Sequence, residues 1–253
     1  MSFSYPLWPY GVMFRCTANL TMVLDPLLGP PKTCSLAGAS KLSNALDPLG
    51  YSDPQADEDF TPDALPMVIV YRGLGPESGY SWDDAEWMAK EIVKATPELV
   101  KKVIFVVPYD YNQDCETCIQ QATKLINERN GTISSYSLCG FSQGGTCVYK
   151  YVAIRDWKIV GLIDPVPPTT TLDKDGKAHS VLDSVPARNI RYVYNANNWS
   201  KSKLLGGIKE LRNYLKKRGV DVAAADAANK AGVQHPDMPG LFFKTFGGAL
   251  ADD

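Results

Sequence analysis

Gly140-Phe141-Ser142-Gln143-Gly144-Gly145 is the stretch of sequence that decides the fold. It follows a β-rich run and precedes apolar residues at helical spacing. A serine between glycines at such a junction predicts a sharp, strained turn from a strand into a helix, because glycine fits where a side chain would collide. The turn would expose the Ser142 hydroxyl. It would also place the Gln143 N–H at a helix N-terminus, where it favours a developing negative charge.

The composition is that of an ordinary globular protein. Of the 253 residues, 45% are hydrophobic and 21% are charged, a balance typical of soluble domains. No apolar run approaches the roughly 20 residues that a membrane span needs. The formal net charge of −2, without a long basic block, argues against nucleic acid as the main partner.

Cysteine usage and the start of the chain predict a cytoplasmic protein. The first ten residues lack a basic region followed by an apolar one, so we expect no secretory signal. Six cysteines are too few for a disulfide scaffold in a chain of this length. Cys115 and Cys118 form a C-x-x-C pair, for which surface thiols on a helix and a local disulfide both stay open. The pair lacks two further zinc ligands, and we expect neither a metal nor a cofactor.

Two regions of different character meet near residue 66. Residues 1–66 are rich in proline and turn residues and show no sustained period of 2 or 3.6, which predicts an irregular N-terminal arm. Four aromatic residues between positions 5 and 14 indicate that this arm packs on something. The sequence leaves two alternatives open for what this arm contacts: the body of this protein or a protein partner.

From residue 67 onward, short β-branched runs alternate with helical periods, which is typical of a parallel sheet with crossover helices. The predicted strands are residues 67–71, 103–107, 132–139, 158–163 and 190–194, with a short last strand at 220–222. The predicted fold class is therefore α/β. It comprises a parallel sheet of about five to six strands flanked by helices, in a domain spanning residues 67–253.

A serine hydroxyl needs a base to take its proton and an acid to orient that base. The chain has two histidines. His235 is the favoured base because it lies in a predicted loop after the last strand, in the chain order serine, aspartate, histidine. His179, in a hydrophilic loop, is the alternative.

The acid is selected by its place in the predicted sheet. Parallel strands end along one edge, where ligands gather. Asp164 ends the strand that follows the Ser142 strand, so its carboxylate can reach the same edge. Asp110 is a weaker candidate, and the fifth strand ends in asparagines. Because Asp164 precedes a proline, a purely turn-forming role also stays open.

The elbow and the segment Gly161-Leu-Ile-Asp-Pro-Val-Pro-Pro168 resemble the α/β-hydrolases, in particular serine esterases, cutinase-like enzymes and acyl thioesterases. Thioesterase domains carry their acid after the corresponding strand. The resemblance spans residues 67 to about 247. It implies Ser142 as nucleophile, Asp164 as acid and His235 as base. It also implies an oxyanion hole made by the Gln143 N–H and an N–H of the Gly73-Leu74 loop.

The sequence departs from that family in two places. Arg72-Gly73 stands where the family often has His-Gly, and asparagines stand at the commoner position of the acid. The resemblance implies a hydrolase that cleaves a small-molecule ester or thioester through an acyl-enzyme on Ser142. The competing interpretation is a non-catalytic, hydrolase-like scaffold that binds a partner through residues 1–66. The short loop 165–186 favours an open cleft and a modest acyl group.

Overall fold

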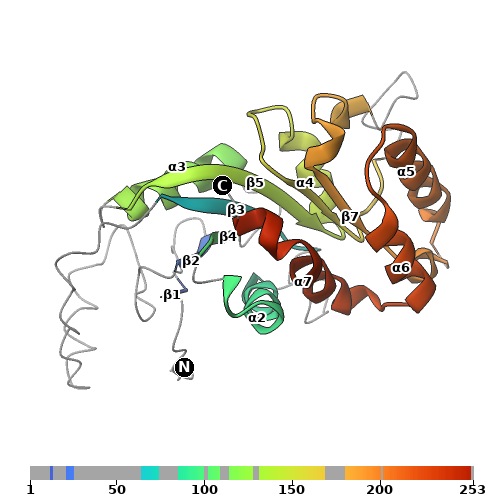
Figure 1. Cartoon of the computed structure of the whole chain (residues 1–253), viewed down its shortest axis with the longest axis horizontal. Coiled ribbons are helices and arrows are strands. Elements are labelled where there is room, and N and C mark those ends of the chain that lie inside the picture. Colours follow the sequence, from blue (N-terminus) through green and yellow to red (C-terminus); the bar gives the residue numbers. More distant parts are fainter. Residues whose placement is uncertain are drawn as a thin grey trace.

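The computed structural model describes residues 12–13, 21–25, 64–73, 85–99, 102–108, 114–127, 131–168, 180–200 and 202–251. Within these residues the strands form one sheet of seven, in the order β1-β2-β4-β3-β5-β6-β7 (Figure 1). The strands are β1 (Val12–Met13), β2 (Thr21–Asp25), β3 (Leu65–Tyr71), β4 (Ile104–Pro108), β5 (Ile133–Phe141), β6 (Val160–Ile163) and β7 (Ile190–Val193). The last five are mutually parallel, which confirms the predicted α/β class with a parallel sheet.

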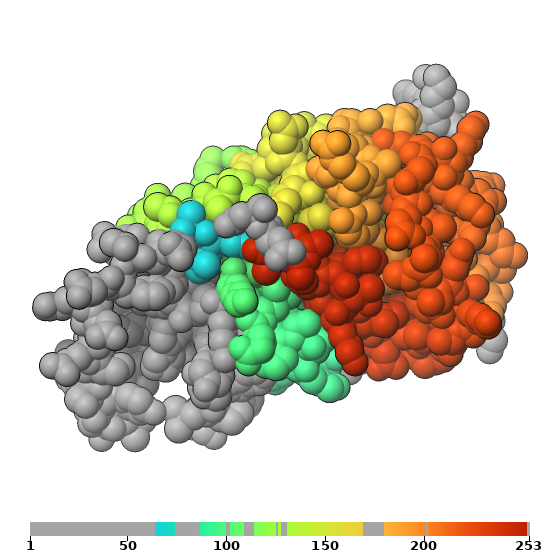
Figure 2. All heavy atoms as spheres, viewed as in Figure 1, coloured from blue at the N-terminus to red at the C-terminus, as the bar shows by residue number. Residues whose placement is uncertain are grey.

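Helices cover both faces of the sheet. They are α2 (Ala85–Ala95), α3 (Cys115–Asn127), α4 (Gly144–Tyr151), α5 (Leu205–Lys217), α6 (Ala223–Ala231) and α7 (Met238–Ala251). Successive strand residues point to opposite faces. In β3, Met67, Ile69 and Tyr71 join the core under α3, α4 and α5, whereas Val68 and Val70 join the core under α2 and α7. Figure 2 shows α2 and α7 side by side on one face of the molecule.

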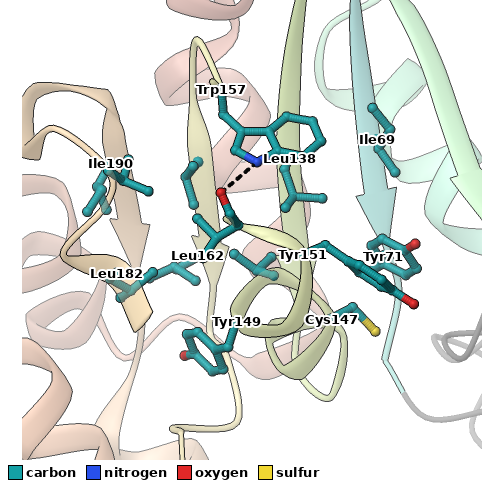
Figure 3. Close-up of a cluster of buried hydrophobic side chains, with 14 of the residues drawn as sticks. Ile69, Tyr71, Leu138, Cys147, Tyr149, Tyr151, Trp157, Leu162, Leu182 and Ile190 are labelled. Carbon is teal, nitrogen blue, oxygen red and sulfur yellow. Dashed lines mark hydrogen bonds between the residues drawn. The ribbon is translucent and has the colours of Figure 1, made fainter. Parts of the chain in front are cut away.

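The core beneath α4 fixes the helix that follows Ser142. Figure 3 shows Ile69, Leu138 and Leu162, from three neighbouring strands, beside the aromatic and thiol side chains of α4. Tyr151 of that helix stacks on Tyr71 with ring centroids 5.8 Å apart. The indole of Trp157 donates a hydrogen bond of 3.0 Å to the Val152 carbonyl just after the helix. The last residue of α4 is therefore held against the end of β3.

Two short strands in the N-terminal region were not expected from the sequence. β1 pairs with β2, and β2 pairs antiparallel with β4, so residues 12–13 and 21–25 extend the parallel sheet at one end. Their pattern is too brief to be separated from the turn residues around it. The proposed boundary at residue 66 stays a prediction, and the aromatic residues at positions 5 to 14 lie outside the described ranges.

The expected strand at 220–222 was wrong. Gly219 takes a φ of +83°, and the Val220 N–H donates to the Leu215 carbonyl at 3.0 Å. This bond closes the end of α5 and keeps Val220 out of any ladder. The helix α6 that follows was not expected from the sequence, although its run of alanines consists of the strongest helix former.

Candidate active site

Ser142 ends β5 in a strained conformation. Its φ is +53°, and its side chain lies at a buried position with 9% exposed. The Ser142 N–H still donates to the Ile163 carbonyl at 3.0 Å, so the residue remains tied to the neighbouring strand. Its carbonyl accepts from the N–H groups of Gly145 at 3.0 Å and Val166 at 2.8 Å. A conformation that costs energy is thus held by hydrogen bonds on both sides of the residue.

Two glycines make this turn possible. A Cβ atom at Gly140 would lie 2.3 Å from the Gly144 carbonyl oxygen, and one at Gly144 would lie 2.3 Å from the Tyr71 carbonyl oxygen. Neither separation is sterically allowed. The absence of these side chains lets α4 begin against the end of β3, where the segment Arg72-Gly73 starts.

The structure describes two of the three residues predicted to form the oxyanion hole. Gln143 is half-buried and precedes α4 with helical backbone angles, φ −59° and ψ −27°. Its N–H therefore belongs to the unsatisfied donors at the start of that helix. Gly73 is buried just after β3, and Leu74 lies outside the described residues. The use of both N–H groups for an oxyanion stays a prediction.

Asp164 follows β6, the strand next to β5, and its carboxylate is fully buried. Four donors bind it. Oδ1 accepts from the Asn195 N–H at 3.1 Å and from Trp199 Nε1 at 3.0 Å. Oδ2 accepts from Asn198 Nδ2 at 2.7 Å and meets His235 Nδ1 at 2.7 Å. A buried carboxylate is costly unless it is paired and hydrogen-bonded, and here every donor comes from a loop beyond β6.

His235 sits at the start of a 3-10 helix, His235–Asp237, between α6 and α7, where a loop was expected. Since an ionised carboxylate only accepts, Nδ1 is the donor to Asp164. The second nitrogen, Nε2, is then the acceptor of a neutral ring. The imidazole packs on Phe141 with centroids 4.6 Å apart, and Trp199 meets it edge-on at 5.5 Å. Phe141 precedes Ser142, so the ring lies beside the elbow.

The structure thus joins Asp164 and His235 directly and brings both to the end of the Ser142 strand. The alternatives His179 and Asp110 lie outside the described ranges. Sequence reasoning missed the three donors Asn195, Asn198 and Trp199. The sequence signal for this cluster of donors is the group of asparagines after β7, which stands at the family's commoner position of the acid.

The C-x-x-C pair is a buried structural feature. Cys115, Cys118, Cys139 and Cys147 are all buried and outside any disulfide, so the expectation of surface thiols or a local disulfide was wrong for the first two. Burial raises the pKa of the Cys115 thiol to about 12, which leaves it protonated and unreactive at neutral pH. Among the residues that the structure describes, no group of histidine, cysteine and carboxylate side chains is arranged to hold a metal.

A hollow of about 660 Å³ lies elsewhere, along α3, and includes none of the site residues. Its guanidinium, Arg155, makes two hydrogen bonds of 2.8 Å to Glu116 and lies 4.4 Å from the Tyr136 ring centroid. The guanidinium is thus paired with a carboxylate and an aromatic ring of the protein itself, which favours a structural role. None of the helices in the described ranges combines the length and the apolar character needed to cross a membrane.

Comparisons with known proteins find distant structural likenesses. No family model matches the chain, and no curated protein matches it. Among solved structures, a proposed carboxylesterase from Lactobacillus plantarum is 13% identical with a TM-score of 0.48, covering 92% of this chain and 94% of that one. FphF, a fluorophosphonate-binding serine hydrolase of Staphylococcus aureus, is 12% identical with a TM-score of 0.43 and 93% coverage of each chain.

The chain spans about half the length of a further structure, Est1E from Butyrivibrio proteoclasticus. That match is 16% identical with a TM-score of 0.30, and covers 46% of this chain and 47% of the other. The order of the parallel strands, β4-β3-β5-β6-β7, with helices on both faces of the sheet, is that of an α/β fold. At these identities and TM-scores, the names of the neighbours assign no activity to this chain.

Proposed function

We propose that this protein is a serine hydrolase that cleaves a carboxylic ester or thioester through an acyl-enzyme on Ser142. The observation that carries the proposal is the 2.7 Å contact between His235 Nδ1 and Asp164 Oδ2 beside a strained, glycine-flanked serine. A buried carboxylate, an imidazole oriented by it and a serine at an adjacent strand end are the three parts of a nucleophile relay.

In the proposed reaction, His235 Nε2 takes the proton as Ser142 Oγ forms a bond to the acyl carbon. The imidazolium then gives that proton to the departing alcohol or thiol as the bond to the acyl carbon breaks. Water attacks the acyl-enzyme by the same route, again giving its proton to Nε2, and releases the carboxylic acid. Asp164 stays ionised and stabilises the imidazolium through Nδ1.

The negative charge that develops on the carbonyl oxygen needs donors that are already in place. The Gln143 N–H at the start of α4 is one proposed donor, because helix N-termini favour negative charge. The second is an N–H of the Gly73-Leu74 segment. The close approach of Gly144 to the Tyr71 and Arg72 carbonyls brings the chain just before Gly73 to this helix end, which supports the proposal.

Labelling with a fluorophosphonate probe tests the proposal, because the probe reacts only with an activated serine. Wild-type protein should label once per chain, and Ser142→Ala should abolish the label. Ser184→Ala is the matched control, because Ser184 is exposed and bonds only a local carbonyl, that of Val181. Label that persists in Ser142→Ala, or wild-type protein that never labels, contradicts the proposal.

The acyl group can be identified with a chain-length series of nitrophenyl esters and acyl thioesters. Hydrolysis that is lost in Ser142→Ala defines the substrate class. If a correctly folded wild-type protein hydrolyses none of them and does not label, the non-catalytic scaffold remains. A pull-down with and without residues 1–66 would then test that reading. A cytoplasmic location also stays a prediction.

A further inference from the structure

The loop after β7 holds the acid and the base of the site at the same time. Asn195 begins a short 3-10 helix, Ala196–Trp199, by accepting a hydrogen bond of 3.0 Å from the Asn197 N–H on its side-chain oxygen. This tight turn directs consecutive residues Asn198 and Trp199 to the same carboxylate. Asn198 binds the oxygen that His235 also binds, whereas Trp199 binds the other one.

Trp199 contacts both partners of the proposed relay. Its indole N–H donates to Asp164 Oδ1 at 3.0 Å, and its ring meets the His235 imidazole at 84° with centroids 5.5 Å apart. The other aromatic contact of the imidazole is Phe141, tilted by 31° at 4.6 Å. The imidazole therefore contacts two aromatic rings, and the Trp199 indole also binds its carboxylate partner.

We propose that Trp199 is a positioning residue that sets the orientation and basicity of His235 through Asp164. The inference rests on the proposed hydrolase function. Each oxygen of Asp164 has two donors, so the charge of the carboxylate is shared among them. Loss of the indole donor leaves more of that charge to the His235 contact and releases one side of the imidazole.

The ionisable surroundings of His235 are simple in the described part of the chain. Asp164 meets the ring at Nδ1, and Asp237 belongs to the same 3-10 helix. Tyr192 of β7 lies close enough to Asp164 to interact electrostatically, but burial raises its pKa well above the usual value. The phenol stays neutral across the working range, and Asp164 is the carboxylate in direct contact with the ring.

The test compares Trp199→Phe with Trp157→Phe. Both changes keep an aromatic ring and remove an indole hydrogen bond of 3.0 Å, but Trp157 donates to the Val152 carbonyl in the core. We expect Trp199→Phe to lower kcat/KM for the best ester about tenfold. It should also move the acid limb of the pH profile upward, because a carboxylate with one donor fewer favours the imidazolium. Trp157→Phe should leave the limb in place.

A readout without turnover separates this inference from the proposed function. In a proton NMR spectrum, the His235 Nδ1 proton should resonate far downfield in wild-type protein and shift in Trp199→Phe, even if no substrate is found. Failure of fluorophosphonate labelling would overturn the hydrolase alone. An unchanged Nδ1 resonance and an unmoved acid limb in folded Trp199→Phe would overturn the positioning role. The same changes in Trp157→Phe would also overturn it.

If Trp199→Phe does not fold, the wild-type protein still gives an answer. The Trp199 indole N–H, assigned through its Overhauser contact with the His235 ring, should exchange slowly with water and shift as His235 titrates. An indole proton that exchanges freely and ignores this titration would contradict the bond to Asp164.

Discussion

Ser142 and Asp164 occupy equivalent positions at the ends of neighbouring strands. Among the described residues, they are the two non-glycine positions with a positive φ, +53° and +39°. Each still donates its N–H to the last residue of the next strand, Ser142 to Ile163 at 3.0 Å and Asp164 to Val193 at 2.8 Å. The chain then turns sharply away. Both side chains of the proposed relay are thus presented by the same strained turn, repeated one strand apart.

Asp164→Asn should remove the negative charge with little change of shape. The new amide group would face donors that already point at this position, so the His235 ring would lose its acceptor. We expect ester hydrolysis to fall by about 10⁴ in kcat, as the same change does in a serine protease whose histidine is left in the wrong tautomer. Asp183→Asn is the control, because Asp183 is exposed and binds Tyr214 and Arg218 away from the site. Wild-type kcat in Asp164→Asn would refute the assigned role.

Gly144→Ala should destabilise the protein, although alanine is the better helix former. Its Cβ would lie 2.3 Å from the Tyr71 carbonyl oxygen, so the backbone at the end of β3 and at the start of α4 would have to move apart. We expect the free energy of unfolding to fall by about 3 kcal/mol, an overpacking cost. Gly206→Ala in α5 has nothing within 4 Å of the new Cβ, so it should be neutral or stabilising by up to about 1 kcal/mol. Equal urea midpoints for the two variants would disprove this reading of the elbow.

Asn195→Ala should separate stability from activity. The Asn195 amide donates to the Val233 carbonyl at 2.8 Å and so ties the loop after β7 to the segment that precedes His235. Asn189 makes the same kind of bond, to the Trp157 carbonyl at 3.0 Å, away from the site. Each alanine variant should lose about 1 kcal/mol of stability. Only Asn195→Ala should also lose kcat, and equal kcat in both variants would show that this tie does not orient His235.

The buried thiols should respond to alkaline pH. Burial raises the pKa of Cys115 and of Cys139 from 9.0 to about 12 in the folded state. Between these values the unfolded chain loses protons that the folded one keeps, so the free energy of unfolding should fall as pH rises from about 9 to about 12. Cys139→Ala should flatten that slope in urea titrations. At neutral pH, iodoacetamide should spare both thiols until the protein unfolds, and rapid labelling of folded protein would contradict their burial.

Much of the site follows from short-range patterns in the sequence. The glycines around Ser142 predict a turn in which the glycine positions have no room for a side chain. The close approaches at Gly140 and Gly144 confirm this. The pairing of β5 with β6 was also accessible, because consecutive parallel strands tend to be neighbours. With β5 beside β6, Asp164 reaches the edge where Ser142 lies. Because the chain has two histidines, the sequence offers two candidates for the general base.

Other parts depend on contacts that local patterns do not carry. β2 pairs with β4 from more than 80 positions away, and its five residues look like their irregular surroundings. The role of Trp199 depends on a 3-10 turn directing its indole to a carboxylate 35 residues earlier. Residues 195–199, taken alone, do not show whether the asparagines lie on the surface or donate hydrogen bonds to a buried carboxylate.

The aromatic contacts around His235 should make the protein's tryptophan fluorescence sensitive to changes at this site. Trp199 lies edge-on to the imidazole, and the Trp87 ring lies 5.9 Å from that of Phe141, which also contacts the imidazole. An imidazolium accepts an electron from an excited indole, so it dims the emission of a neighbouring tryptophan. Intrinsic fluorescence should therefore fall whenever His235 carries its proton, and should report a covalent adduct at Ser142 without any added dye.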